Sequence, residues 1–166
     1  MAAHLILSRE IAYRKLQRMA YEIAERNILE EQIILAGIKE NGKIISKILY
    51  SYLKDIFKGE VTLIEIALDK KDPKNISLSD NINFDQKVII VTDDVANSGR
   101  TLLYALKPFL NYYPKKIQTL VLVERSYKEF PVATDYVGLS VSTAFTEKII
   151  VETSNNEIEG ASLITG

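Results

Sequence analysis

Two adjacent carboxylates, Asp93 and Asp94, stand between an aliphatic run and a small polar turn in the stretch VIIVTDDVANSGRTL, residues 88–102. The turn leads toward a helix, whose first backbone N–H groups and positive end could bind a phosphate. It consists of Ala96, Asn97, Ser98, Gly99, Arg100 and Thr101. Carboxylates beside it can accept hydrogen bonds from hydroxyl groups. A phosphorylated sugar would therefore satisfy both halves of the segment.

The acidic pair could instead cap a helix. A lone Asp-Asp dipeptide favours that interpretation, because carboxylates are common N-caps. Here an aliphatic strand pattern precedes the pair and Ser-Gly-Arg-Thr follows it. The whole arrangement, rather than either residue, favours ligand binding.

The rest of the chain alternates between helix and strand patterns. Apolar residues recur at helical spacing from the N-cap Ser8 to about Asn27, and again over 44–56 before Gly59. Aliphatic strands are expected over 32–38, 61–68, 88–91 and 117–123, a polar loop over 70–86 and a further helix over 102–110. This order predicts an α/β fold with a mostly parallel sheet flanked by helices.

Sheets of this kind bind ligands at the carboxyl ends of their strands. We therefore expect Asp93 and Asp94 at that edge of the sheet rather than inside the core. Residues 152–166 are expected to form a final strand followed by a partly ordered tail.

Whole-chain properties predict a single domain, residues 1–166, long enough to bury a core. The formal net charge is −1 and the sequence pI is about 5.9, which argues against a surface coated in positive charge for nucleic acid. Cysteine is absent and His4 is the single histidine, which excludes disulfides and thiolate chemistry. No stretch has the pattern of a signal peptide or a membrane span, so we expect a cytoplasmic protein without a membrane partner.

The acidic segment resembles the phosphoribosyl-diphosphate (PRPP) signature of type I phosphoribosyltransferases: aliphatic residues, two acidic residues, then a loop ending in Thr or Ser, Gly, Arg or Lys, Thr. Other segments resemble landmarks of the PyrR subfamily, uracil phosphoribosyltransferases that can double as RNA-binding attenuators of pyrimidine operons. These segments are AYEIAERN (20–27), GIK (37–39), VLVER (121–125) and EFPVATDYVG (129–138). The resemblance runs in the family's order from about Ile6 to Val151.

The resemblance implies a type I phosphoribosyltransferase fold with a small hood segment over the base. It implies transfer of the phosphoribosyl group of PRPP to uracil, giving UMP and pyrophosphate. Magnesium would bridge the diphosphate and ribose oxygens, with no direct protein ligand assigned. Positive charge would build on the sugar while negative charge leaves on pyrophosphate. Catalysis would therefore consist chiefly of positioning and electrostatic stabilisation.

The resemblance also implies roles for matching residues. Asp93 and Asp94 would hold the ribose hydroxyls and, with Arg125, form the catalytic set. The 5′-phosphate would be wrapped by residues 96–101. The pyrophosphate loop would consist of Gly37, Ile38, Lys39, Glu40, Asn41 and Gly42. The hood over the base would comprise Arg125, Tyr136, Val137 and Gly138.

Three segments depart from the subfamily pattern. The pyrophosphate loop usually reads Lys-Thr-Arg-Gly, but residues 39–42 read Lys-Glu-Asn-Gly, with a carboxylate close to a polyanion. The usual Asp-Arg-Gly-His-Arg becomes Glu-Arg-Ser-Tyr-Lys over 124–128. The flexible loop, residues 70–86, is shorter than expected, and Leu-Asp-Lys over 68–70 replaces Tyr-Arg-Asp. Positive charge near the diphosphate could be restored by Lys43, Lys70 or Lys71.

An alternative function is a nucleotide-sensing, RNA-binding regulator with weak or no catalysis. Arg14, Lys15 and Arg18 form a basic strip on the first expected helix, although such a strip is usually a solvated face. Tyrosine stands at Tyr21 and Tyr127 where the subfamily has histidine. RNA therefore ranks below transfer as a function.

The identity of the base and the assembly state also stay open. The hydrogen bonds that choose a base do not follow from sequence, so a purine remains an alternative to uracil. The family implies a homodimer or a larger homo-oligomer, and Tyr112 and Tyr113 could contribute to such a contact.

Overall fold

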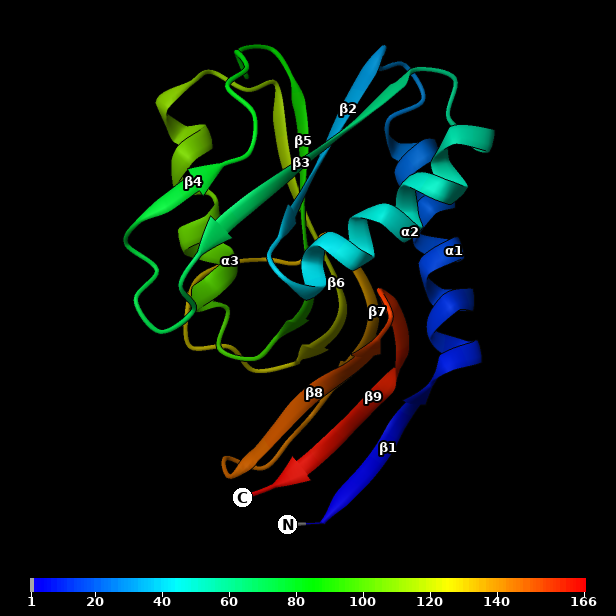
Figure 1. Ribbon diagram of the computed structural model, residues 1–166, viewed down its shortest axis with the longest axis vertical. Helices are drawn as coiled ribbons and strands as arrows, with labels where there is room; N and C mark the ends of the chain where they lie inside the picture. The colour runs from blue at the N-terminus through cyan, green and yellow to red at the C-terminus, as the bar shows by residue number, and fades with distance from the viewer. Residues whose placement is uncertain (1) are drawn as a thin grey trace.

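Six strands form a mostly parallel sheet through the middle of the protein (Figure 1). The computed structural model describes residues 2–166. In spatial order the strands are β4 (Ile76–Leu78), β3 (Glu60–Leu68), β2 (Gln32–Ile38), β5 (Val88–Ala96), β6 (Lys116–Arg125) and β7 (Tyr136–Val141). Strand β4 runs antiparallel to β3, and the other pairings are parallel. The carboxyl ends of β2, β5 and β6 therefore meet at one edge of the sheet.

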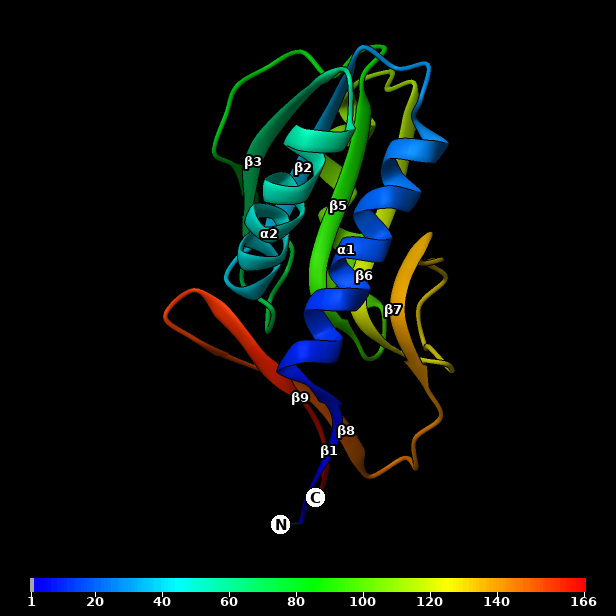
Figure 2. The same cartoon turned by 90° about the vertical axis from the view of Figure 1, so that its right-hand side faces the viewer.

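Helices cover both faces of this sheet. On one face lie α1 (Arg9–Arg26) and α2 (Asn41–Ile56), and on the other lie α3 (Arg100–Ala105) and the 3-10 helix η1 (Lys107–Asn111) (Figures 1 and 2). Successive strand residues point to opposite faces. Ile33 and Leu35 of β2 accordingly join the apolar cluster of α1 and α2, whereas Ile34 and Ala36 join that of α3 and η1. Burial on both faces explains the uninterrupted aliphatic runs.

A second, three-stranded antiparallel sheet lies beyond the carboxyl edge of the main sheet (Figure 1). Its order is β1 (Ala3–Ser8), β9 (Glu157–Thr165), β8 (Glu147–Ser154), so the two ends of the chain lie side by side. Strand β8 is an edge strand and contacts β5 and β6 of the main sheet. The small sheet thus covers the edge at which the acidic pair is expected.

Several sequence predictions are confirmed. Ser8 caps α1 by accepting a hydrogen bond from the Ile11 backbone N–H at 3.3 Å. Strand β2 has the predicted bounds, and the predicted helix over 102–110 divides into α3 and η1. Pro108 explains the division, because proline lacks a backbone donor and disfavours helical geometry at the residue before it.

Three predictions about the chain's extremities and loop were wrong or incomplete. The loop over 70–86 contains strand β4. The predicted partly ordered tail is a strand, because Ile158 and Ala161 of β9 are buried in the core and β9 pairs with both of its neighbours. Strand β1 was not predicted. No helix within residues 2–166 is both long and apolar enough to cross a membrane.

Candidate active site

Asp93 and Asp94 lie in the last part of β5, between β2 and β6. Their position at the carboxyl edge is as predicted, but the prediction that they lie outside the core was wrong: the residues are 1% and 4% exposed. Strand β5 continues to Ala96 because β6 pairs with it as far as that residue. The two carboxylates are therefore held by a paired strand rather than by a loop.

One of the four carboxylate oxygens of the acidic pair has no hydrogen-bond partner in the described part of the chain. Asp93 Oδ1 accepts from the Asp94 backbone N–H at 2.9 Å, and Asp94 Oδ1 accepts from the Val95 N–H at 2.9 Å. Asp94 Oδ2 accepts from Asn41 Nδ2 at 2.8 Å. Asp93 Oδ2 is buried and has no hydrogen-bond partner in the described part of the chain. Burial, and secondarily the charge of Asp94, raise the pKa of the Asp93 carboxyl well above its ordinary value.

The turn after β5 forms a small hollow. Gly99 adopts φ 86°, a left-handed conformation that favours glycine, and an added Cβ would lie 2.8 Å from Val132 Cγ1. The Ser98 carbonyl accepts from the Glu129 and Phe130 N–H groups at 3.0 Å each. The hollow has a volume of about 190 Å³ and is lined by Lys70 and residues 95–102. Its size suits a phosphate group.

Lys70 closes the hollow on the side of the acidic pair. Its Nζ lies 3.5 Å from Asp93 Oδ1 and 3.9 Å from Asp94 Oδ1. Arg100 Nη2 donates to the Lys70 carbonyl at 2.7 Å, which ties the segment after β3 to the start of α3. The sequence departure at Lys70 therefore places a cation next to the acidic pair.

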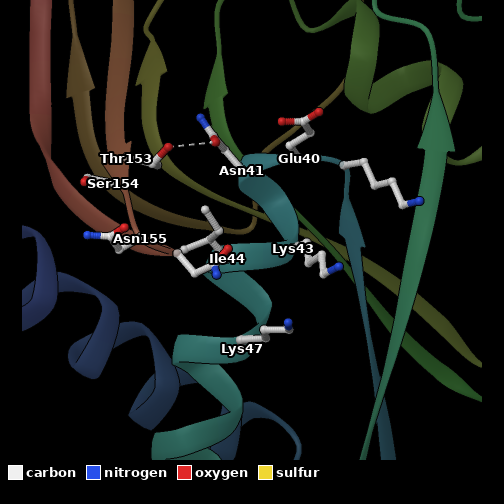
Figure 3. Close-up of a pocket in the computed structure, with 10 residues that line it drawn as sticks. Glu40, Asn41, Lys43, Ile44, Lys47, Thr153, Ser154 and Asn155 are labelled. Atoms are coloured by element: carbon white, nitrogen blue, oxygen red, sulfur yellow. Dashed lines mark hydrogen bonds between the residues drawn. The ribbon is translucent and has the colours of Figure 1, made fainter.

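The predicted pyrophosphate loop, residues 37–42, comprises the end of β2, a turn with a cis Lys39–Glu40 peptide bond and the start of α2. Lys39 Nζ and Lys43 Nζ lie 3.7 and 2.7 Å from the Glu65 carboxylate. The pKa of Glu65 is lowered, and the hydrogen bond from Lys43 is the largest cause. Glu40 is exposed. A cavity of about 430 Å³ lies between α2 and the β8–β9 hairpin. Figure 3 shows the turn above this cavity.

The segment predicted to form the hood lies on β7. Tyr136 and Gly138 are buried on β7, the outermost strand of the main sheet; the Tyr136 ring packs under Arg26, whose guanidinium carbon is 4.6 Å from the ring centroid. The Val137 carbonyl accepts from Arg18 at 2.9 Å. The small sheet over the site is built from β1, β8 and β9. The side chain of Tyr136 thus lies in the core, and the role of residues 136–138 in a hood stays a prediction.

Three side chains at the carboxyl edge of the main sheet form hydrogen bonds with β8. The Asn97 amide donates to the Ile149 carbonyl at 3.3 Å and accepts from the Ile149 N–H at 3.4 Å. The Arg125 guanidinium donates to the Glu147 carbonyl, and its buried Nε has no partner within residues 2–166. Thr153 Oγ1 donates to Asn41 Oδ1 at 3.3 Å. Sequence reasoning missed the contribution of β8, because its partners lie 22 to 112 residues away.

The donor set fits magnesium bound through a ligand. Residues 2–166 contain no cluster of three metal-ligating side chains. The buried, unpartnered Asp93 Oδ2 is a hard oxygen acceptor beside the hollow, and Mg²⁺ prefers oxygen ligands and is usually bound partly through substrate phosphates. A metal that arrives on a phosphorylated substrate would meet an oxygen acceptor at Asp93.

Comparison with known proteins identifies the family. The phosphoribosyl transferase domain matches residues 5–156. The chain belongs to the phosphoribosyltransferase family. Its relatives include "Bifunctional protein PyrR" of Haemophilus ducreyi, 30% identical with 91% of this chain and 90% of the relative covered. The Enterococcus faecalis protein of the same name is 37% identical, with coverages of 84% and 83%, and that of Elusimicrobium minutum is 36% identical, with coverages of 97% and 94%.

Solved structures confirm the phosphoribosyltransferase fold. The hypoxanthine phosphoribosyltransferase of Trypanosoma cruzi has a TM-score of 0.80 at 16% identity, covering 98% of this chain and 96% of that chain. A hypoxanthine-guanine phosphoribosyltransferase of Bacillus anthracis has a TM-score of 0.73 at 21% identity, with coverages of 97% and 98%. At these identities the likeness shows the fold alone.

A substitution of Lys70 tests whether the hollow lined by residues 95–102 binds a phosphate group. We expect Lys70→Met to weaken binding of magnesium-PRPP about two- to fivefold, because an exposed cation contributes little and its effect is screened. The difference should shrink as ionic strength rises, measured by isothermal titration calorimetry. Lys71→Met, one residue further from the acidic pair, is the matched control. Equal affinity of both variants and the original protein at low salt would contradict this role of Lys70.

Proposed function

We propose that this phosphoribosyltransferase transfers the phosphoribosyl group of PRPP to uracil, forming UMP and pyrophosphate. The observation that carries the proposal is the Asp93–Asp94 pair at the end of β5, next to a phosphate-sized hollow. Two carboxylates suit the two ribose hydroxyls, and the hollow suits the 5′-phosphate. A ribose 5-phosphate derivative carries both groups.

The proposed roles follow from position. The free Oδ2 of Asp93 accepts a hydrogen bond from a ribose hydroxyl, and the 5′-phosphate fills the hollow of residues 95–102. The turn over 39–42 then faces the diphosphate. As uracil N1 bonds to C1 of the ribose, the bond to the diphosphate breaks and the N1 proton is released to solvent, while the acidic pair stabilises positive charge on the sugar. A magnesium ion brought by the substrate would offset the negative charge of the diphosphate.

The base is assigned by relatedness and not by geometry. The relatives at 30–37% identity carry the name PyrR, and the segment 129–138 resembles that subfamily. The structures named for hypoxanthine share only the fold. Uracil is therefore proposed ahead of a purine.

RNA regulation receives less support. In the basic strip of α1, Arg14 pairs with Glu10 at 2.7 Å and Arg18 pairs with Glu22 at 2.9 Å. Arg18 also donates to backbone carbonyls of β7. Two of the three cations are thus already paired, which leaves a weak electrostatic footprint for a polyanion.

A coupled assay with PRPP, magnesium and a panel of bases tests the proposal, following pyrophosphate release together with nucleotide formation. We expect UMP with uracil and no nucleotide with hypoxanthine or guanine. Purine nucleotide formation would change the assigned base. Absence of product with every base would contradict transfer, and titration with PRPP and UMP would then show whether the site still binds nucleotides.

A further inference from the structure

The side chain of Asn41 connects the acidic pair to the small sheet. Asn41 is the first residue of α2 and is half-buried. Its Nδ2 donates to Asp94 Oδ2 at 2.8 Å, and its Oδ1 accepts from Thr153 Oγ1 at 3.3 Å. Figure 3 shows Asn41 and Thr153 joined above the cavity between α2 and β8. One amide therefore contacts both parts of the site.

The Asn41 amide satisfies both partners, because it carries a donor and an acceptor. The carboxylate of Asp94 requires a donor, and the Thr153 hydroxyl donates to the amide oxygen. An aspartate would keep the acceptor and lose the donor, whereas an aliphatic residue would lose both. The reversed amide would place Oδ1 against a carboxylate oxygen, which fixes the orientation shown.

Asn41 differs from the other side chains that reach β8. Three side chains near the carboxyl ends of the neighbouring strands β2, β5 and β6 bond to this edge strand: Asn41 at the start of α2, Asn97 after β5 and Arg125 at the end of β6. Asn97 and Arg125 bond to the β8 backbone. Among the residues described, Asn41 is the one whose side chain bonds to both β8 and the acidic pair.

We propose that Asn41 is a positioning residue that orients Asp94 for the ribose and fixes the small sheet to the same carboxylate. This inference rests on the proposed function, because it assigns Asn41 a task in that reaction. The amide is occupied by Asp94 and Thr153, so its contribution to diphosphate binding is indirect. The position of β8 and the orientation of the acidic pair are thereby set together.

The charged surroundings of Asp94 make the proposal measurable by titration. Lys70, from the segment after β3, and Asp93, from β5 itself, are the charged groups that face Asp94, while α2 and β8 present the neutral Asn41 and Thr153. A hydrogen bond to the charged form of a carboxyl lowers its pKa. Removing the Asn41 donor should therefore move the acidic limb of the kcat/KM profile to higher pH.

Three variants separate the two arms of the amide. Asn41→Leu removes both arms, Asn41→Asp keeps the acceptor for Thr153 and adds a like charge beside Asp94, and Thr153→Val removes the β8 arm alone. An aspartate in the first turn of α2 favours the helix, so Asn41→Asp is expected to fold. Ser154→Ala, which removes an exposed neighbouring hydroxyl on β8, is the control.

We expect Asn41→Leu to raise the KM for PRPP about tenfold, the size expected for a lost charge-assisted hydrogen bond. The acidic limb of the kcat/KM profile should move to higher pH in Asn41→Leu and further in Asn41→Asp, and stay in place in Thr153→Val. Calorimetric titration with magnesium-PRPP should show weaker binding in Asn41→Leu and Asn41→Asp than in Ser154→Ala. Titrations of Asn41→Leu and Asn41→Asp that match Ser154→Ala would overturn the inference. Failure of the proposed function would instead appear as an original protein that forms no nucleotide, whose calorimetric titration with magnesium-PRPP still decides the role of Asn41.

Discussion

Replacing Asp93 with asparagine is expected to weaken PRPP binding about ten- to a hundredfold without lowering thermal stability at neutral pH. The affinity falls because an amide cannot replace a charged acceptor, and hydrogen bonds to charged groups contribute about 1.5–3 kcal/mol. Calorimetric titration with magnesium-PRPP measures the loss. Asp94→Asn should also weaken binding, because it removes the second carboxylate and its charged bond to Asn41.

The stability of the Asp93 variant should follow from the burial of the native charge. Asp93 is 1% exposed, one of its oxygens has no hydrogen-bond partner in the structure described, and Asp94 repels it. Removing such a charge relieves a desolvation penalty, although Lys70 offsets part of it at 3.5 Å. We expect an unchanged or higher Tm. Asp55→Asn, an exposed carboxylate near the end of α2, is the control for loss of one negative charge.

The raised pKa of Asp93 predicts in which direction stability changes with pH. The folded-state pKa of Asp93 lies above its ordinary value of 3.8, so the folded state binds a proton that the unfolded state has released. Its contribution to stability is fully present below pH 3.8 and is lost as pH rises through the raised value. The original protein should therefore show a falling component of stability across that range, and Asp93→Asn should lack it. A lower Tm together with an unchanged pH slope would contradict the assigned burial.

Local patterns predicted most of the main sheet. The aliphatic runs at 32–38 and 88–91 identified central strands because both faces of a covered parallel sheet are buried. Helix α1 was visible from Ser8 and its apolar spacing. The acidic pair could be located because a strand followed by a small-residue turn is itself a local pattern.

The small sheet could not be predicted in the same way. Strands β8 and β9 form a local hairpin, but strand β1 comes from the other end of the chain, and its pairing with β9 depends on contacts across about 150 residues, such as Leu7 with Ala161. The resemblance also placed the hood at 136–138, where burial of Tyr136 against α1 shows a core strand. A sequence motif can indicate which backbone segment lies at the site. It cannot indicate the hydrogen-bond partners of Asn41 and Asn97, because tertiary packing determines them.

Gly42→Ala is expected to have the largest effect on the site. An added Cβ would lie 2.4 Å from the Thr92 carbonyl oxygen and 3.1 Å from Asp93 Cα. Space, and not backbone conformation, requires glycine here, because α2 begins directly against β5. Strand β5 is paired with β2 on one side and β6 on the other, so it cannot yield. The first turn of α2 must therefore move away from the acidic pair.

That movement would break the contacts that join the turn to the site. The Gly42 carbonyl accepts from Thr92 Oγ1 at 3.0 Å and from Ser46 Oγ at 3.2 Å, and the neighbouring Asn41 holds Asp94. Overpacking of this kind costs about 1–3 kcal/mol of stability. A displacement of about 1 Å at a positioning element can lower activity about a hundredfold. We expect both losses, measured by denaturant unfolding and by kcat/KM for PRPP. Gly166→Ala, where the added methyl meets an ordinary contact at 3.4 Å, is the control. If Gly42→Ala kept the kcat/KM of the original protein, α2 could shift without disturbing Asp94. The position of the pyrophosphate turn would then not depend on the acidic pair.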